Sequence, residues 1–288
     1  MNNSRLLLRL VPPASFLLCF FLAVAIPTAC PAAVPASADK TTFTVATFNI
    51  NFGNPDLTGV VAAIRKSGAD IVVLQETNAV SERFLRRQLA REYPFMQFQP
   101  PKGKYLASGF GFLSKFRLED RKFLKAKHGL FGTCICRVRV GGRSVQIASV
   151  HLSPLGALRE GGLAAALGKL AEIEAIHKKE ILQILESVDA AGPALILGDF
   201  NSLSAFVAPR MLTDKGFSDS FAAVTKEPEE HPTWRWKVGD KEMAYRLDYI
   251  FHRGGLATRE SSVVRTEASD HSLLVSRLSI EPEPKAAK

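Results

Sequence analysis

Short apolar runs alternate with amphipathic segments from Thr42 onward, and this pattern predicts strands and helices in turn. Runs with a two-residue repeat or with continuous apolar character are typical of strands. Eight segments fit this description: FTVATFNI, DIVVLQE, GFGFLSKF, TCICRVRV, VQIASVHL, PALILGDF, RLDYIFHR and SLLVSRLSI. The residues GGRS between TCICRVRV and VQIASVHL predict a hairpin that joins these two strands.

Apolar residues at helical spacing predict helices between these strands. DLTGVVAAIRKSG carries apolar residues on one face, with Asp56 as the expected cap and Gly68 as the expected stop. SERFLRRQLAREY is expected to begin at Ser81 as its cap. Residues 159–189 are expected to contain a long helix, and VAPRMLTDKG (207–216) a short one.

The mixture of hairpins and helices, without an internal repeat or a linker, predicts one α+β domain over residues 39–280. Two packed mixed β-sheets flanked by helices, a four-layer α/β sandwich, account for the predicted elements. Residues 281–288, which contain Pro and Lys, are expected to be a disordered tail.

Residues 1–38 have a composition that sets them apart from the domain. A positively charged start is followed by the apolar run Ala14–Ala29, which is short for a membrane span, and by the small residues ASA at 36–38. This pattern predicts a signal peptide and an exported, periplasmic or extracellular chain that begins near Asp39. Two alternatives stay open: a lipid anchor on Cys30, and an N-terminal membrane anchor that is retained.

The net charge bears on the type of binding partner, and the cysteine content bears on whether the domain contains a disulfide. The chain has a formal net charge of +9, and removal of a leader that contains Arg5 and Arg9 but no acidic residue leaves +7. A basic balance suits an anionic partner such as nucleic acid or a phospholipid surface, although a soluble basic protein would look the same. Cys134 and Cys136 share one face of a predicted strand, so we expect core thiols and no disulfide.

Polar side chains stand where the apolar strands end. A single such residue would indicate only a turn, but the pattern recurs at six strand ends. The side chains in question are Asn49, Glu76, His151, Asp199 with Asn201, Asp248, and Asp270 with His271. We expect strand ends that converge on one edge of a sandwich to gather these groups into a single polar pocket.

The residue types in this pocket indicate hydrolysis of a phosphate ester. Hard oxygen ligands without thiolates favour Mg²⁺, Mn²⁺ or Ca²⁺, and Glu76, Asn49 and Asp270 fit the few protein ligands that Mg²⁺ takes. An Asp–His pair can act as a general base, and a metal with a base and phosphate-binding donors completes such a site. The absence of a nucleophilic Ser elbow, a P-loop or a GxGxxG motif argues against acyl transfer and nucleotide-loop chemistry.

The motifs TFNIN, LQE, HLSP, GDFN, TWRW followed by RLDYIF, and SDHSLL occur in this order between Thr42 and Ile280. In this the chain resembles the endonuclease/exonuclease/phosphatase superfamily, which includes DNase I-like nucleases, abasic-site endonucleases, sphingomyelinases and inositol-polyphosphate phosphatases. The resemblance implies a DNase I-like sandwich and a metal-dependent phosphoesterase.

The resemblance also implies roles for individual residues. Glu76 would be the principal metal ligand, with Asn49 beside it, Asp270 in contact with the metal directly or through water, and Asn51 assisting through water. On the catalytic side, the implied roles concern His151, Asp199, Asn201, Asp248 and His271. Asp199 would position the attacking water or protonate the leaving group, Asn201 and His151 would bind the phosphate, and His271 would be a general base oriented by Asp248.

Some positions depart from the family pattern or carry a simpler interpretation. Leu273 stands where the family often has Pro, a position expected to shape a turn, and Tyr105 is a guess for the family's tyrosine near the site. Trp234 and Trp236 alternate on a predicted strand and are expected to be packing or rim residues, with base-stacking platforms as the less favoured alternative. Four further histidines are expected at the surface: His128, His177, His231 and His252.

The sequence thus predicts a secreted, Mg²⁺-dependent phosphodiesterase, acting as a monomer and most simply as an endonuclease on nucleic acid. An inositol-phosphate phosphatase or a sphingomyelinase-like lipid phosphodiesterase is the alternative, and a binding module that lost catalysis is a third reading that the intact site residues oppose. A polyanion is favoured by the basic helical face formed by Arg83, Arg86, Arg87 and Arg91. The sequence predicts no long apolar hairpin of the kind that inserts into lipid.

Overall fold

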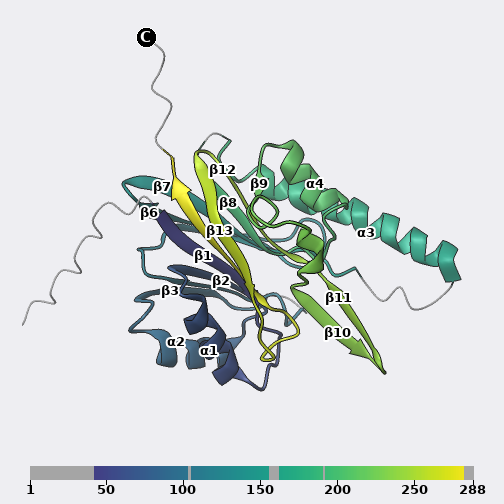
Figure 1. Cartoon of the computed structure of the whole chain (residues 1–288), viewed down its shortest axis with the longest axis horizontal. Helices are drawn as coiled ribbons and strands as arrows, with labels where there is room; N and C mark the ends of the chain where they lie inside the picture. The colour runs from purple at the N-terminus through teal and green to yellow at the C-terminus, as the bar shows by residue number, and fades with distance from the viewer. Residues whose placement is uncertain (1–41, 103–104, 156–161, 191, 282–288) are drawn as a thin grey trace, which may run out of the picture. The chain divides into compact units, whose positions relative to one another are not determined.

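The computed structural model describes residues 42–102, 105–155, 162–190 and 192–281 (Figure 1). The chain divides into the units Met1–Ser37 and Ala38–Lys288, and all described residues belong to the second. The predicted leader and, apart from Glu281, the predicted tail lie outside the described residues. Whether these segments are cleaved, anchored or disordered therefore stays a prediction.

Two six-stranded sheets form the centre of the described part of the chain. The first sheet has the order β13 (Leu256–Val264), β14 (Leu273–Ile280), β1 (Thr42–Asn49), β2 (Ile71–Gln75), β4 (Phe110–Ser114), β3 (Phe95–Gln99). The second has the order β5 (Glu119–Leu124), β6 (Thr133–Val140), β7 (Arg143–His151), β8 (Ala194–Asp199), β12 (Asp248–Arg253), β9 (Ser218–Asp219). Strands β10 (Trp234–Val238) and β11 (Lys241–Tyr245) form a separate two-stranded ribbon.

Each large sheet contains one parallel pair among antiparallel neighbours. β1 runs parallel to β2 in the first sheet, and β7 runs parallel to β8 in the second. The other described pairings in both sheets are antiparallel, including the predicted hairpin of β6 and β7. Gly141 and Gly142 have φ angles of 53° and 74° in its turn, as a two-residue hairpin of the primed type requires.

Four α-helices accompany the sheets in the described residues: α1 (Leu57–Ser67), α2 (Ala79–Leu89), α3 (Gly162–Leu185) and α4 (Val207–Asp214), with a 3₁₀ turn at Pro228–Glu230. Asp56 caps α1 and Gly68 ends it with a φ of 62°, as predicted. The predicted cap of α2 was wrong. Asn78 is the cap, because its side chain accepts from two backbone N–H groups, whereas Ser81 completes the capping box from inside the helix.

Three apolar clusters hold the layers together. One lies between the two sheets and includes Cys134 and Cys136, which are buried free thiols as predicted. A second packs α1 and α2 against the outer face of the first sheet, and a third packs α3 and α4 against the outer face of the second. The order helix, sheet, sheet, helix confirms the predicted four-layer sandwich (Figure 1).

The eight strands predicted from apolar runs form, and the strand expected at Trp234 and Trp236 forms as β10, but five further strands had not been predicted. β3, β5, β9 and β13 are the edge strands of the two large sheets, and β11 belongs to the exposed ribbon. Edge strands carry polar and charged side chains that discourage pairing with other chains, so their apolar pattern is weak. β5, with the sequence EDRKFL, shows how far such a strand departs from the pattern of a buried one.

Candidate functional site

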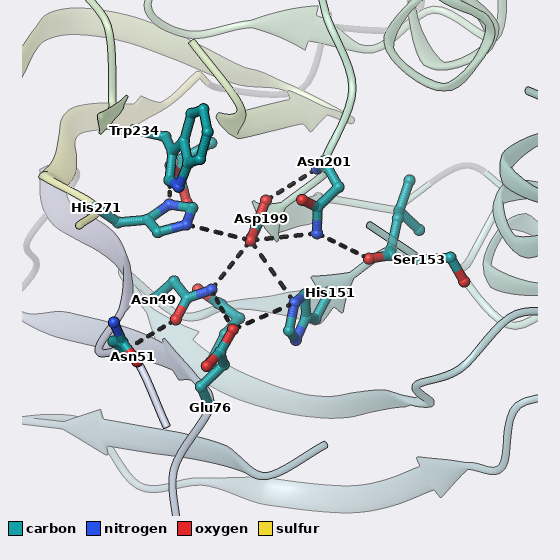
Figure 2. A network of polar contacts seen from close by, with 12 residues as sticks. Asn49, Asn51, Glu76, His151, Ser153, Asp199, Asn201, Trp234 and His271 are labelled. Atoms are coloured by element: carbon teal, nitrogen blue, oxygen red, sulfur yellow. Dashed lines mark hydrogen bonds and ion pairs between the residues drawn. The ribbon is translucent and has the colours of Figure 1, made fainter. Parts of the chain in front are cut away.

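The two parallel strand pairs end at the same edge of the sandwich and carry the site there (Figure 2). β1 ends at Asn49 beside the end of β2, and Glu76 follows directly. In the other sheet β7 ends at His151, opposite Asp199 at the end of β8, and Asp248 begins β12 opposite Asp199. The structure thus brings the predicted strand-end residues together, while their roles remain predictions.

The backbone is unusual at three of these positions. Asn51, Glu76 and Asn201 have φ angles of 61°, 61° and 45°. Residues other than glycine rarely adopt this region of positive φ. Each such residue costs about 1–3 kcal/mol, and such costs are concentrated at functional sites. Gly198 allows the close approach of β8 to β7, because a Cβ atom there would lie 1.9 Å from the Val150 carbonyl oxygen.

Amide side chains link three carboxylates at the open side of the pocket. The Asn49 Nδ2 group donates to Glu76 Oε1 and to Asp199 Oδ2, at 3.0 Å in each case. Asn51 donates from its backbone N to Asn49 Oδ1 at 3.0 Å and from Nδ2 to Asp270 Oδ1 at 3.1 Å. Neutral amides therefore occupy the positions between carboxylates, where a cation would also be favoured by charge.

Two further donors orient the outer carboxylates. The backbone N–H of Phe52 donates to Glu76 Oε2 at 2.6 Å, and the indole Nε1 of Trp234 donates to Asp270 Oδ2 at 3.1 Å. Trp234 was expected only as a packing or rim residue. Its contact with Asp270 makes it part of the site, and Figure 2 shows its ring beside His271.

The ring of His271 lies between two buried carboxylates. Its Nδ1 is 2.8 Å from Asp248 Oδ2, and its Nε2 is 3.6 Å from Asp199 Oδ2. Burial alone would lower the pKa of His271, but the charges of Asp248 and Asp199 outweigh it and raise the pKa to about 10. At neutral pH the protein's own groups therefore favour an imidazolium, which donates protons, whereas the predicted general base would need a neutral ring.

His151 lies on the opposite side of Asp199 in a different environment. Its Nε2 is 3.8 Å from Glu76 Oε1 and 3.7 Å from Asp199 Oδ2. Burial lowers the pKa of His151 to about 4, although Asp199 opposes the shift, so this ring is neutral at pH 7. Phe131 stacks on it with centroids 4.0 Å apart, and Tyr105 contacts Phe131 edge-on at 6.2 Å.

Asn201 is held in place by the carboxylate of Asp199 and by the backbone carbonyl of Leu152, which directly follows β7. Its backbone N–H donates to Asp199 Oδ1 at 2.9 Å, and its Nδ2 donates to the Leu152 carbonyl oxygen at 3.0 Å. The amide also lies 3.4 Å from Asp199 Oδ2. Asp199 Oδ2 is thus surrounded by nitrogen atoms from both sheets: Asn49 Nδ2, Asn201 Nδ2, His151 Nε2 and His271 Nε2.

A buried polar stripe on α3 supports the segment after His151, and the sequence analysis missed it. His177 Nε2 is 2.7 Å from the Ser153 carbonyl oxygen, and the Glu180 carboxyl accepts from Ser153 Oγ at 3.0 Å and from its N–H at 3.3 Å. Burial raises the pKa of Glu180 to about 7, because hydrogen bonds from Ser153 only partly offset the loss of solvent. Histidine and glutamate at i and i+3 on an otherwise apolar helix face were the available signal.

Two of the four histidines expected at the surface are buried, so that prediction was wrong for His177 and His252. His177 turns inward to the Ser153 carbonyl, and His252 lies on β12 with Nε2 2.8 Å from Thr258 Oγ1. His128 and His231 are exposed as predicted. The sequence around a single histidine does not show whether a backbone carbonyl far away in the chain will be its hydrogen-bond partner.

A second missed element fixes the start of β12. Arg246 is fully buried and donates to Asp219 Oδ2 at 2.7 Å and to Glu229 Oε1 at 2.8 Å. The Thr233 hydroxyl accepts from the backbone N–H of Asp248 at 3.0 Å. These contacts hold the strand end from which Asp248 reaches His271.

Other predicted features lie away from the pocket or differ in detail. Leu273 is buried at the start of β14 opposite Val264, within the strand that the sequence predicted, although the family often has Pro at this position. The basic residues of α2 are exposed, but Arg86 forms an ion pair with Glu82 at 2.9 Å and stacks over Phe98 at 4.9 Å. Part of this basic face therefore stabilises α2 itself.

Two groups of residues could hold a divalent cation. The atoms of Asp199, Asp248 and His271 that could bind a metal all lie within 4.8 Å of one another. In that group, however, His271 Nδ1 is already engaged with Asp248. The linked carboxylates of Glu76 and Asp270, with the amide of Asn49, offer the hard oxygen atoms that such a cation prefers. The donor set at this edge of the pocket therefore fits a divalent cation.

Comparison with known proteins places this site in a family. The model of the Endonuclease/Exonuclease/phosphatase family matches residues 46–271, a span that contains every strand-end residue above. No curated protein sequence matches the chain. Among the described residues, no helix has both the length and the apolar character that crossing a membrane requires.

Solved structures share the fold at low sequence identity. An endonuclease/exonuclease/phosphatase from Beutenbergia cavernae is 22% identical, with a TM-score of 0.67, and the match covers 86% of this chain and 74% of that one. D. rerio TDP2 in complex with a single-strand DNA product is 15% identical, with a TM-score of 0.64 and coverage of 83% and 100%. The human Nocturnin catalytic domain with bound sulfate is 17% identical, with a TM-score of 0.63 and coverage of 83% and 93%.

The family match spans both sheets and the edge at which their carboxylates, amides and imidazoles meet. Members of this family hydrolyse phosphate esters with the help of a divalent metal. The chain belongs to the Endonuclease/Exonuclease/phosphatase family.

Proposed function

We propose that this protein is an exported, Mg²⁺-dependent phosphodiesterase that acts as a monomer and cleaves nucleic acid as an endonuclease. The observation that carries the proposal is the convergence of two different sets of groups on Asp199. On one side are carboxylates linked by amide side chains. On the other side are two buried imidazoles, with a lowered pKa for His151 and a raised pKa for His271.

The nitrogen atoms around Asp199 suit a phosphate. His271 is an imidazolium kept in orientation by Asp248, and Asn201 is fixed by the Leu152 carbonyl. Donors held in advance around a buried centre stabilise charge that develops on phosphoryl oxygens, and the loss of one such donor typically costs about 10²–10³-fold in rate. His151 is neutral, so it can bind the phosphate without adding a second positive charge.

The proton chemistry follows from the same charges. A divalent cation at the Glu76 edge supplies neutralisation of phosphate charge when it is bound. Asp199, as a buried carboxylate with a raised pKa, is the group best placed to align and deprotonate water. His271 is then the donor to the phosphate or to the leaving oxygen, a revision of the base role that the sequence suggested.

Magnesium is the proposed ion because of the ligand chemistry. Glu76, Asp270 and the amide of Asn49 are hard oxygen ligands, and the two described cysteines lie in the core between the sheets. Mg²⁺ keeps several waters and takes one or two carboxylates together with phosphate oxygens of the substrate. Mn²⁺ accepts the same ligands and is expected to substitute for it.

Nucleic acid is the proposed substrate because the part of the chain after residue 38 has a net charge of +7 and because the site lies open at a sheet edge. A structural relative, D. rerio TDP2, has been crystallised with a single-strand DNA product, which supports the same substrate class here. The test is a panel of plasmid, single-stranded DNA, RNA, inositol phosphates and sphingomyelin, each with Mg²⁺ and with EDTA.

We expect Mg²⁺-dependent nicking of plasmid or cleavage within single strands, with Glu76→Gln as the background control. Hydrolysis of sphingomyelin or inositol phosphates alone would contradict the nuclease proposal but not the phosphoesterase class. Cleavage that continues in excess EDTA would contradict the dependence on a metal.

Export is proposed from the composition of residues 1–38. The expected result of amino-terminal sequencing of the protein recovered from outside the cytoplasm is a start near Asp39. A lipid-modified start at Cys30 would show a lipid anchor, and an intact Met1 on exported protein would show a retained leader. An intact Met1 on protein found only in the cytoplasm would contradict export.

A further inference from the structure

The ribbon of β10 and β11 has an apolar face that remains exposed. Trp234 pairs with Tyr245 and Trp236 pairs with Met243, and because side chains alternate along a strand these four share one face. Trp236, Met243 and Tyr245 are 46%, 36% and 43% exposed.

This apolar face begins at the functional site. Trp234 forms a bridge with His271, its indole donates to Asp270 Oδ2, and the ring stacks with Tyr245 at a centroid distance of 6.2 Å. The Arg235 N–H donates to the Asp270 carbonyl oxygen at 2.9 Å and fixes the base of the ribbon. Figure 1 shows β10 and β11 extending away from the two sheets, so the apolar face leads outward from the site.

The concentration of aromatic surface on the ribbon distinguishes it from the other exposed apolar residues. Those residues are spread over α2, α3 and two loops: Val80, Leu106, Leu167, Leu182 and Val224. Scattered apolar residues at a surface are ordinary, whereas a contiguous exposed patch marks a binding site. A patch that starts at a catalytic pocket is placed to contact the part of the substrate next to the reacting group.

The chemistry of the ribbon favours planar rings over a lipid surface. Its turn consists of Gly239 and Asp240, and Lys241 follows as the first residue of β11. Both charged residues are exposed, so the tip presents charge where a membrane-inserting hairpin would present apolar groups. The opposite face carries Lys237 and the ion pair of Arg235 with Glu242 at 3.3 Å, and these residues border a cavity of about 350 Å³ that reaches Asp270. The aromatic rings on one face suit the planar faces of bases, and Lys237 on the other face can contact a phosphate of the same strand.

We propose that the apolar face of the ribbon is a stacking platform for the nucleobases next to the scissile phosphate of a single-stranded nucleic acid. This inference rests on the proposed function and deepens it. Trp236 provides the main stacking surface beyond Trp234, with Met243 and Tyr245 beside it. Stacking depends on the face of a base, so the platform tolerates different sequences while it prefers strands whose bases are unpaired.

The test compares two single-stranded oligonucleotides of equal length and charge. One carries bases throughout, and the other has base-free tetrahydrofuran residues around the cleavage position. For Trp236→Ala we expect KM on the base-bearing strand to rise about five- to 100-fold, the range that stacking of one base supports, with a much smaller change on the base-free strand. Trp236→Phe should restore most of the loss, and Val80→Ala, a change at another exposed apolar residue, should behave as wild type.

Several results would overturn the inference. Equal losses on both strands for Trp236→Ala would show that Trp236 only supports the ribbon. Loss of binding to sphingomyelin or phosphatidylglycerol vesicles, with unchanged oligonucleotide kinetics, would assign the platform to lipid. Wild-type protein that cleaves neither oligonucleotide would overturn the nuclease proposal and this inference together, whereas wild-type cleavage without a base effect would overturn this inference alone.

Discussion

The ends of the two parallel strand pairs have similar backbone arrangements, but the side chains at these ends differ in their exposure to solvent. At the end of β1 and β2, the Glu76 side chain is 19% exposed and is joined to its neighbours by amides. At the end of β7 and β8, the side chains of His151 and Asp199 are only 3% and 2% exposed. An open end can exchange water for a cation, whereas a closed end controls protonation through burial and charge.

The difference shows that the same feature, the end of a parallel strand pair, can suit two chemical roles when the degree of burial differs. The closed end holds one imidazole neutral and, together with Asp248, holds the other charged, with pKa values lowered to about 4 for His151 and raised to about 10 for His271. At the open end, carboxylate and amide oxygen atoms lie close together, and amide side chains link them. We therefore propose that residues at the end of the first sheet bind the cation and that residues at the end of the second sheet bind the phosphate and transfer protons.

The largest expected effect comes from removing the charge at the open end. Glu76→Gln keeps the size of the side chain and removes the carboxylate proposed as the principal cation ligand. Because a bound metal contributes several kcal/mol to catalysis, turnover should fall by about 10³-fold or more while the thermal unfolding temperature stays near that of wild type. Glu82→Gln, at an exposed ion pair on α2, is the matched control and should retain full activity. Activity of Glu76→Gln close to wild type would refute the assignment.

The next effect concerns the pair that orients charge at the closed end. His271→Ala should lower kcat by about 10²–10⁴-fold, the range for a positioned proton donor or acceptor. Asp248→Asn removes the charge that favours the imidazolium, and because the two groups act as one unit the double variant should be scarcely worse than His271→Ala.

Single-turnover kinetics of the two single variants and the double variant measure this coupling. His231→Ala, which changes an exposed histidine, is the control and should be active. If the two single losses multiply in the double variant, Asp248 and His271 work independently, and the charge pairing described for the closed end is wrong.

A smaller effect should appear in the pH dependence of stability. The pKa of Glu180 is about 7 in the folded protein and 4.5 in the unfolded chain, so the folded state binds this proton more tightly. The stability contributed by the protonated group is complete below pH 4.5 and is lost as pH rises toward and through 7, by up to about 3 kcal/mol. Glu180→Gln cannot ionise and should escape this loss.

Urea unfolding at about pH 4 and about pH 8 tests the point, because these two pH values lie below 4.5 and above 7 and so bracket the two pKa values. As pH rises, the unfolding free energy of the wild type should fall relative to that of Glu180→Gln. Glu172→Gln, at an exposed position of α3, should follow the wild type. Parallel pH profiles for Glu180→Gln and wild type would show that burial of Glu180 has no energetic consequence.

Much of the fold could be predicted because buried strands leave a strong local signal. IVVLQ and ALILGD are apolar up to their last residues, Gln75 and Asp199, as strands covered on both faces are, and both form where they were expected. β5 and β13 could not be predicted, because one side of an edge strand is bounded by solvent and its charges interrupt the pattern.

The gathering of the site residues could be predicted for a related reason. A polar group at the end of a buried strand is unusual enough to be recognised when it recurs. The supporting residues could not be found in this way, because His177 and Arg246 are buried only through partners distant in sequence. Their contacts depend on how helices and loops pack, which the local pattern does not encode.

Direct measurement of Mn²⁺ binding in three proteins tests the division of tasks between the two ends. The wild type should bind Mn²⁺, monitored by its paramagnetic resonance signal, and His271→Ala should bind it with similar affinity. Glu76→Gln should lose at least about 100-fold in affinity, since even changes in residues that only support a metal ligand cost about 10–100-fold. Retained binding in Glu76→Gln together with lost binding in His271→Ala would place the cation in the group of Asp199, Asp248 and His271, and would contradict the account.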